Sequence, residues 1–185
     1  DVYKRQKIKY MFPKAHAAAY MISTLRLGWY KVHRPAEYYA AYFTVRGEGF
    51  DAATVLGGKD SVVQKMTMIK QKGYEATAKD NAEYAALQII NEMLARGIEV
   101  LPIDIYKSKA KMFRLEDGKI RLPFSSMPGV GDAAAESLEA GGQKGEYLSI
   151  EDLQLRTKVS KSVIETLGAV GALEGLPESS QMSLF

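Results

Sequence analysis

The chain has 185 residues, 46% of them hydrophobic and 25% charged, with a formal net charge of +3 and no cysteine. These values predict a soluble globular protein with one ordinary core, or with one core and a small satellite module. They exclude disulfides and thiolate metal sites, and no apolar run approaches the roughly 20 residues of a membrane span, so we expect a cytoplasmic protein without a membrane partner.

The positive charge is concentrated near the start of the chain. Residues 1–36 contain eight Lys and Arg and a single acid, Asp1. Such a block attracts polyanions, although basic helix faces are often only solvated. Residues 1–6 do not begin with Met and lead into no apolar signal-peptide region. A cloning or assembly artefact would explain them, so they carry no weight in the interpretation, and we expect the chain to be a piece of a longer protein.

Four helices are predicted in the first half of the chain. The first begins at about Pro13, which suits a first helical turn, and ends at His33. Three more are expected at residues 36–45, 59–71 and 79–96, each followed by glycine. In the first helix, apolar residues recur at spacings of four, three, four and three, as in an amphipathic helix that faces a core: Ala18, Ile22, Leu25, Trp29 and Val32.

The second half is predicted to contain one β-hairpin and several short helices. Residues 112–115 and 120–122 flank a tight Asp-Gly turn, as the two strands of a hairpin do. Residues 174–185 contain a proline and no helical period. This last segment therefore predicts a flexible tail.

Residues 124–138 match the helix-hairpin-helix pattern: an apolar residue, Pro-Gly, an apolar residue, glycine, then a small residue and a leucine. Two glycines allow a tight turn that brings backbone N–H groups to a helix N-terminus, where the helix dipole favours a phosphate. We therefore predict that Gly129, Val130 and Gly131 contact the DNA backbone without regard to base sequence. A plain α-hairpin is the alternative. Because residues 124–148 carry four acids against one lysine, the hairpin is predicted to be a weak clamp beside a stronger DNA site.

A second, degenerate hairpin is expected after the first. Ser149 and Ser160 are predicted to cap two short helices, with Asp152 placed three residues after Ser149. Residues 171–173 would close this unit. Packing against the first hairpin is its expected role.

The chain ends in a short peptide with two adjacent large apolar side chains: Gln181, Met182, Ser183, Leu184 and Phe185. Docking on the chain's own core is one possibility, but the glycine and proline that precede the peptide argue against it. The pattern favours an extended peptide that inserts Leu184 and Phe185 into a partner's pocket, with polar contacts from Gln181.

A further candidate site lies at the start of the first helix. His16 and Tyr20 are four residues apart and share a helix face, offset from the apolar stripe. Lys9, Lys14 and His16 cluster at a helix N-terminus, which favours anions, and an aromatic ring one turn further can stack on a base or sugar. The combination suits a nucleoside triphosphate, unless Tyr20 simply packs against protein.

In order along the chain, these segments closely resemble the PolC-type DNA polymerase III alpha subunit of low-GC Gram-positive bacteria. Residues 7–20 (KIKYMFPKAHAAAY) resemble its fingers region, and residues 38–46 (YYAAYFTVR) resemble the stretch that follows. Residues 127–131 (MPGVG) resemble its duplex-binding hairpin, and residues 181–185 (QMSLF) its clamp-binding end. This colinearity is more specific than any single motif, although residues 1–6 do not match.

The resemblance implies a C-family DNA-directed DNA polymerase, a nucleotidyltransferase of DNA replication. It implies that His16 and Tyr20 contact the incoming deoxynucleoside triphosphate and that Lys14 lies near its phosphates. Its other implied partners are primer–template DNA, the bacterial sliding clamp and further replisome subunits. It also implies Mg²⁺ catalysis by palm carboxylates. Since the chain has no Asp-x-Asp pair, the Mg²⁺ ligands and catalytic residues are expected upstream, outside this chain, which should not polymerise alone.

The expected fold is mainly α with a small β-hairpin. A fingers subdomain would cover residues 1–122, a helix-hairpin-helix duplex-binding unit residues 123–176, and a flexible clamp-binding tail residues 177–185. The alternative is a non-catalytic helix-hairpin-helix adaptor that docks on the clamp. Such an adaptor would have no reason to carry the nucleotide-binding residues on its first helix.

Overall fold

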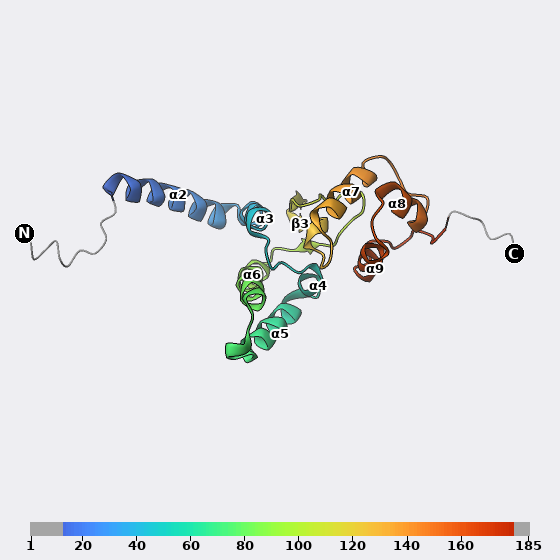
Figure 1. Ribbon diagram of the computed structural model, residues 1–185. Helices are drawn as coiled ribbons and strands as arrows, with labels where there is room; N and C mark the ends of the chain where they lie inside the picture. Colours follow the sequence, from blue (N-terminus) through green and yellow to red (C-terminus); the bar gives the residue numbers. More distant parts are fainter. Residues whose placement is uncertain (1–12, 180–185) are drawn as a thin grey trace, which may run out of the picture.

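The computed structural model describes residues 13–179. In this part the chain is mainly helical and contains one small three-stranded sheet, which confirms the predicted fold class (Figure 1). None of the helices between residues 13 and 179 has both the length and the hydropathy of a membrane span.

The first half of the described chain is helical. Four of its helices agree with the predicted ones to within one residue at each end, and the short α4 was not predicted: α2 (Lys14–His33), α3 (Pro35–Arg46), α4 (Ala52–Leu56), α5 (Gly58–Gln71) and α6 (Ala78–Ala95). Local side chains explain the two well-capped starts. Asp51 accepts a hydrogen bond from the Ala53 N–H at the start of α4. Thr77 and Asp80 form a capping box at the start of α6, with hydrogen bonds of 3.1 and 2.9 Å.

The sheet has the strand order β1-β3-β2. Strands β2 (Arg114–Glu116) and β3 (Lys119–Arg121) form the predicted hairpin. Its two turn residues both have positive φ, 52° at Asp117 and 80° at Gly118, as a two-residue hairpin turn requires. Strand β1 (Val100–Leu101) pairs with β3 in parallel. Two residues are too few to show a strand period, so the sequence did not reveal β1.

The C-terminal part consists of a 3₁₀ turn and three short helices: η2 (Phe124–Ser126), α7 (Asp132–Gly142), α8 (Ile150–Thr157) and α9 (Lys161–Ala169). Ser149 and Ser160 cap α8 and α9 as predicted, accepting hydrogen bonds from Asp152 N–H and Val163 N–H. The first arm of the predicted helix-hairpin-helix is therefore only the turn η2, and α7 is its second helix. A continuous set of buried side chains connects this part to α3, α6 and the sheet.

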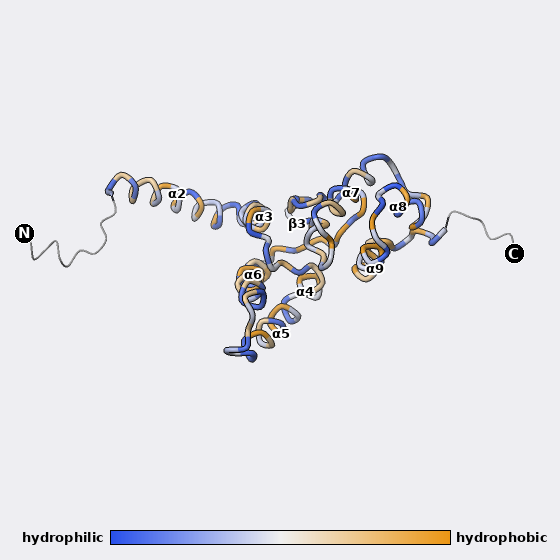
Figure 2. Tube along the Cα trace, viewed as in Figure 1, coloured by the Kyte–Doolittle hydropathy of each residue, from blue (hydrophilic) through white to orange (hydrophobic). Residues whose placement is uncertain are grey.

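Helix α2 forms as predicted, but the prediction that its apolar stripe faces a core is wrong for this chain. Ile22, Leu25, Trp29 and Val32 are 52–67% exposed, and α2 has no buried residue. The helix extends away from the body and meets it only at its C-terminal end (Figure 1). Figure 2 shows hydrophobic residues along the part that stands clear of the rest of the chain. The periodicity predicts a buried face, but no element between residues 13 and 179 covers it.

The prediction of a flexible tail is also wrong for residues 174–179. The carbonyls of Pro177 and Glu178 accept hydrogen bonds from the N–H groups of Ile150 and Glu151, at 2.9 and 3.2 Å. Ser179 Oγ donates to the carboxylate of Glu151 at 2.8 Å. The first N–H groups of α8 lack partners within the helix, and this segment satisfies two of them. Residues 174–179 therefore lie against the second hairpin.

Candidate nucleic-acid interface

The turn before α7 has the backbone that the glycine pattern predicts. Gly129 has a φ of +80°, a left-handed conformation that glycine adopts without strain. Val130 is buried and fixes the turn to the core. Gly131 is the residue before α7, and no side chain caps that helix end. A Cβ atom added at Gly129 or Gly131 would meet no atom within 4 Å. The start of α7 thus faces open space, with room for a backbone phosphate beside its N–H groups.

Lysines from another part of the chain partly compensate the acids of α7. Lys111 Nζ lies 2.8 Å from Asp132 and 3.3 Å from Glu136, and these two carboxylates raise the pKa of Lys111. The acidic excess that predicted a weak clamp is therefore partly compensated by a residue outside the motif. Sequence counting missed this lysine because it lies 21 residues before Asp132.

Glu139 ties α7 to the same segment. Its carboxylate accepts hydrogen bonds from Lys109 Nζ at 2.8 Å and from the Ala110 N–H at 2.6 Å. These contacts, that of Lys109 first, lower the pKa of Glu139. The segment before the β-hairpin therefore holds α7 in place and supplies both lysines of this surface.

The turn between α8 and α9 repeats the first hairpin with different residues. Lys158 has a φ of +56° and is followed by the buried Val159 and by the N-cap Ser160. The same three roles belong to Gly129, Val130 and Gly131 in the first turn. A positive φ, a buried valine and a helix start thus recur without the glycines. The two hairpins pack through α7 and α8, which agrees with the packing role expected for the second.

The predicted nucleotide-binding residues lie on the first two turns of α2. The rings of His16 and Tyr20 are in edge-to-face contact with their centroids 4.5 Å apart, so the two side chains share a face as predicted. Tyr20 is 62% exposed, and it is not used in packing within the described chain. Lys14 is also exposed. Lys9 lies outside the described residues.

An ion pair between α2 and α6 fixes the C-terminal end of α2 on the body. Lys31 Nζ forms an ion pair of 2.8 Å with Glu92, which Arg96 also contacts at 2.8 Å. The hydrogen bond from Lys31 is the main reason why the pKa of Glu92 is lowered. Beneath them Tyr39 is fully buried; burial first, and then the charge of Glu92, raise its pKa to about 12.

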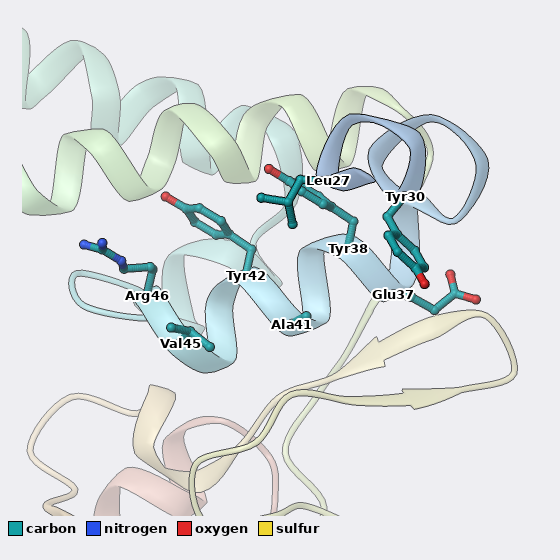
Figure 3. A pocket seen from close by; sticks show the side chains of 8 residues that line it. All are labelled: Leu27, Tyr30, Glu37, Tyr38, Ala41, Tyr42, Val45 and Arg46. Carbon is teal, nitrogen blue, oxygen red and sulfur yellow. The ribbon is translucent and has the colours of Figure 1, made fainter. Parts of the chain in front are cut away.

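A groove of about 610 Å³ lies between the end of α2 and α3 (Figure 3). Its lining is largely apolar and aromatic, with Glu37 and Arg46 at opposite ends: Leu27, Tyr30, Tyr38, Ala41, Tyr42 and Val45. The groove continues the exposed apolar surface of α2. The sequence did not indicate it, because its two walls come from helices whose relative orientation no local pattern defines.

Two further predictions concern the clamp-binding peptide and the metal ligands. The proposed clamp-binding residues Gln181, Met182, Ser183, Leu184 and Phe185 lie outside the described residues. Between residues 13 and 179 no group of three or more His, Asp or Glu side chains could hold a metal ion.

The chain is similar to known proteins over almost its whole length. The model of the helix-hairpin-helix motif matches residues 97–182, which include both turns. The chain is 46% identical over 180 residues to the DNA polymerase III PolC-type of Listeria innocua. It is likewise 46% identical to that of Clostridium perfringens and 43% identical to that of Thermotoga maritima. Each match covers 97% of this chain, and the chain spans 12–13% of the length of these relatives.

Proposed function

Because the chain matches one segment of PolC-type DNA polymerase III over nearly its whole length, we propose that it is part of a bacterial replicative DNA polymerase. In this proposal the segment holds the primer–template duplex and contacts the incoming nucleotide. The catalytic carboxylates and their Mg²⁺ ions belong to the remainder of the polymerase. The adaptor alternative is weaker, since the similarity also covers α2, which an adaptor does not need.

The observation that carries the duplex-binding role is the open turn before α7. Gly129 allows the turn, and Gly131 leaves the first N–H groups of α7 uncovered. Hydrogen bonds from such groups to a phosphate carry no base specificity, as a replicative polymerase requires. Lys111 lies at the same helix end, where it partly compensates the charges of Asp132 and Glu136.

The nucleotide-binding role is proposed for Lys14, His16 and Tyr20. Their position in the first two turns of α2 supports it, because the exposed ring of Tyr20 close to the cationic Lys14 suits a base with its phosphates. In phosphoryl transfer such residues contribute by positioning and by stabilising charge, while the metal ions stabilise the leaving and attacking oxygens. The catalytic share of this segment is therefore positioning of the triphosphate.

The exposed apolar surface of α2 and α3 is proposed to pack against the remainder of the same polymerase. The relatives are about eight times as long as this chain, as their 12–13% coverage shows. A helix with eight large apolar side chains exposed by half or more is unusual for a surface that stays in water. An apolar face of the polymerase would suit the groove in Figure 3, with a basic residue opposite Glu37 and an acidic one opposite Arg46.

The terminal residues Gln181–Phe185 are proposed to bind the bacterial sliding clamp. The two apolar anchors, Leu184 and Phe185, would enter a pocket of the clamp, and Gln181 would make polar contacts. Burial of each anchor is worth about 1.5–3 kcal/mol, and ordering the peptide offsets much of this gain. Weak binding is sufficient, because a polymerase already on DNA gains avidity from the tether. Further replisome subunits are expected partners of the whole polymerase.

The duplex-binding role can be tested with Gly131→Val in the full-length polymerase that contains this segment. The φ of Gly131 is −77° and an added Cβ meets no atom within 4 Å, so the substitution should leave the fold intact. It should obstruct a phosphate at the helix start and remove at least one charge-assisted hydrogen bond, worth about 1.5–3 kcal/mol. We expect primer–template affinity, measured by fluorescence anisotropy, to fall at least about tenfold, with little change in salt dependence because no cation is removed.

Gly168→Val is the matched control. Gly168 lies on α9, and an added Cβ there also meets no atom within 4 Å. Unchanged affinity of Gly131→Val would contradict the proposed contact. A drop in its melting temperature well beyond that of the control would instead support a purely structural role for the glycine.

A further inference from the structure

Helices α5 and α6 form a hairpin that projects from the body, and the 3₁₀ turn η1 (Gly73–Glu75) forms its tip (Figure 1). Tyr74 lies at this tip with 110% of its reference surface exposed. Its side chain therefore makes no appreciable contact with the protein. The ring is therefore fully accessible to a partner.

The tip is firmly built although its ring is free. Gly73 takes a φ of +53° at the turn. Lys72 Nζ forms an ion pair of 2.6 Å with Asp80, which is also the second residue of the capping box with Thr77. Contacts from Lys72 and Thr77 hold the pKa of Asp80 well below its usual range. Tyr74 is therefore not part of a loose loop, and a backbone that is already fixed at this position loses less entropy on binding.

The surroundings of the ring carry a small excess of positive charge. Residues 59–80 contain five lysines and three acids, Asp60, Glu75 and Asp80, the last of which pairs with Lys72. Lys70, in the last turn of α5, and Lys79, in the first turn of α6, are exposed. In the part of the chain that the structure describes, neither has a carboxylate within ion-pair distance. The tip thus differs from the apolar surface of α2. A single aromatic ring beside two unpaired lysines suits a polyanion with flat, unstacked bases.

We propose that Tyr74 stacks on an unpaired base of the template strand, with Lys70 and Lys79 close to the adjoining phosphates. A paired base within a duplex offers no free face, so the ligand is single-stranded. The position of the tip supports the template overhang as its source. Figure 1 shows the tip on the side of the body away from α7, whose start is proposed to contact the duplex. The template that is not yet copied approaches from the side opposite the duplex product. This inference rests on the proposed polymerase function.

The test compares primer–templates in the full-length polymerase and its Tyr74→Ala variant. One primer–template carries a 5′ template overhang of about 15 nucleotides, long enough for a single-strand site, and the other is blunt-ended. We expect Tyr74→Ala to weaken binding of the long-overhang substrate at least about fivefold, the lower end for one base–aromatic stack, and to leave the blunt duplex unaffected. Tyr74→Trp should retain affinity because it retains a ring. Since the side chain touches nothing, both variants should fold.

A second readout locates the base. 2-Aminopurine placed at successive overhang positions should be quenched at one position in the parent enzyme and released there in Tyr74→Ala. Equal affinity of parent and variant for the long overhang would overturn the proposal. Equal loss on both substrates would also overturn it, by placing the tip on the duplex or on another part of the polymerase. If Gly131→Val weakens binding of the blunt duplex while Tyr74→Ala has no effect on the overhang, this inference fails and the duplex role stands. If Tyr74→Ala weakens overhang binding while Gly131→Val has no effect, the duplex role fails and this inference stands.

Discussion

Arg156 joins the two hairpins, and its loss is predicted to destabilise the C-terminal part of the chain. The guanidinium donates hydrogen bonds to three carbonyl oxygens in the last turn of α7 and the loop after it: Gly141 at 2.9 Å, Gly145 at 3.1 Å and Glu146 at 2.9 Å. It also lies over the ring of Tyr147, 4.4 Å from the ring centroid. A planar group with several donors in fixed directions suits this task, and an ammonium does not.

The magnitude follows from these contacts. Arg156→Met keeps much of the aliphatic stem and removes all three hydrogen bonds. A hydrogen bond from a charged donor contributes about 1.5–3 kcal/mol, but the side chain of Arg156 is 23% exposed, so water can replace part of the loss. We expect the free energy of unfolding to fall by about 2–4 kcal/mol in total. With a urea m-value of about 2 kcal/mol per M, the midpoint should fall by about 1–2 M.

The measurement is urea unfolding of the 185-residue chain, followed by circular dichroism. Arg156→Lys should recover less than half of the loss, because one ammonium cannot serve three carbonyls in this arrangement. Arg114→Met is the control, since Arg114 is exposed on β2 and its replacement should change stability by no more than about 0.5 kcal/mol. A loss of that size for Arg156→Met would refute the reasoning and show that water satisfies the three carbonyls.

The remaining predictions concern the two ends of the chain. In the full-length polymerase, Tyr20→Ala should weaken nucleotide use by about 1–3 kcal/mol, the range for a base–aromatic stack; unchanged steady-state kinetics with every nucleotide would contradict the assignment. Deletion of Leu184 and Phe185 should leave distributive synthesis nearly intact and abolish stimulation by the clamp. A peptide of residues 181–185 that fails to bind purified clamp at about millimolar concentration, an affinity near 4 kcal/mol, would rule out the clamp contact.

The helices were predictable because their ends depend on nearby residues. Pro35 ends α2, Thr77 and Asp80 start α6, and Ser149 and Ser160 start α8 and α9. Each of these effects acts within about one helical turn, so it is visible in the sequence. Strand β1 and helix α4 were missed because elements of two and five residues show no measurable period.

The candidate site was predictable only in part. The turn has a local requirement for positive φ at Gly129, and Gly131 follows it in the same linear motif, so both glycines were identified from the sequence. Lys111 was not, because its pairing with Asp132 and Glu136 joins residues more than 20 positions apart. Tyr74 was also missed, because no local pattern shows that the rest of the described chain leaves its ring fully exposed.

The sequence by itself determined the order and limits of the helices, the hairpin turns and the resemblance to PolC-type DNA polymerase III. These depend on local backbone preferences and on residue identity, which a linear pattern contains. Only the tertiary structure decided which faces are covered. The apolar period of α2 correctly predicts a helix, but whether that stripe is buried depends on a partner surface, and no element between residues 13 and 179 provides one. The net charge around the first hairpin also depends on the tertiary structure, because Lys111 from a distant segment lies beside Asp132 and Glu136.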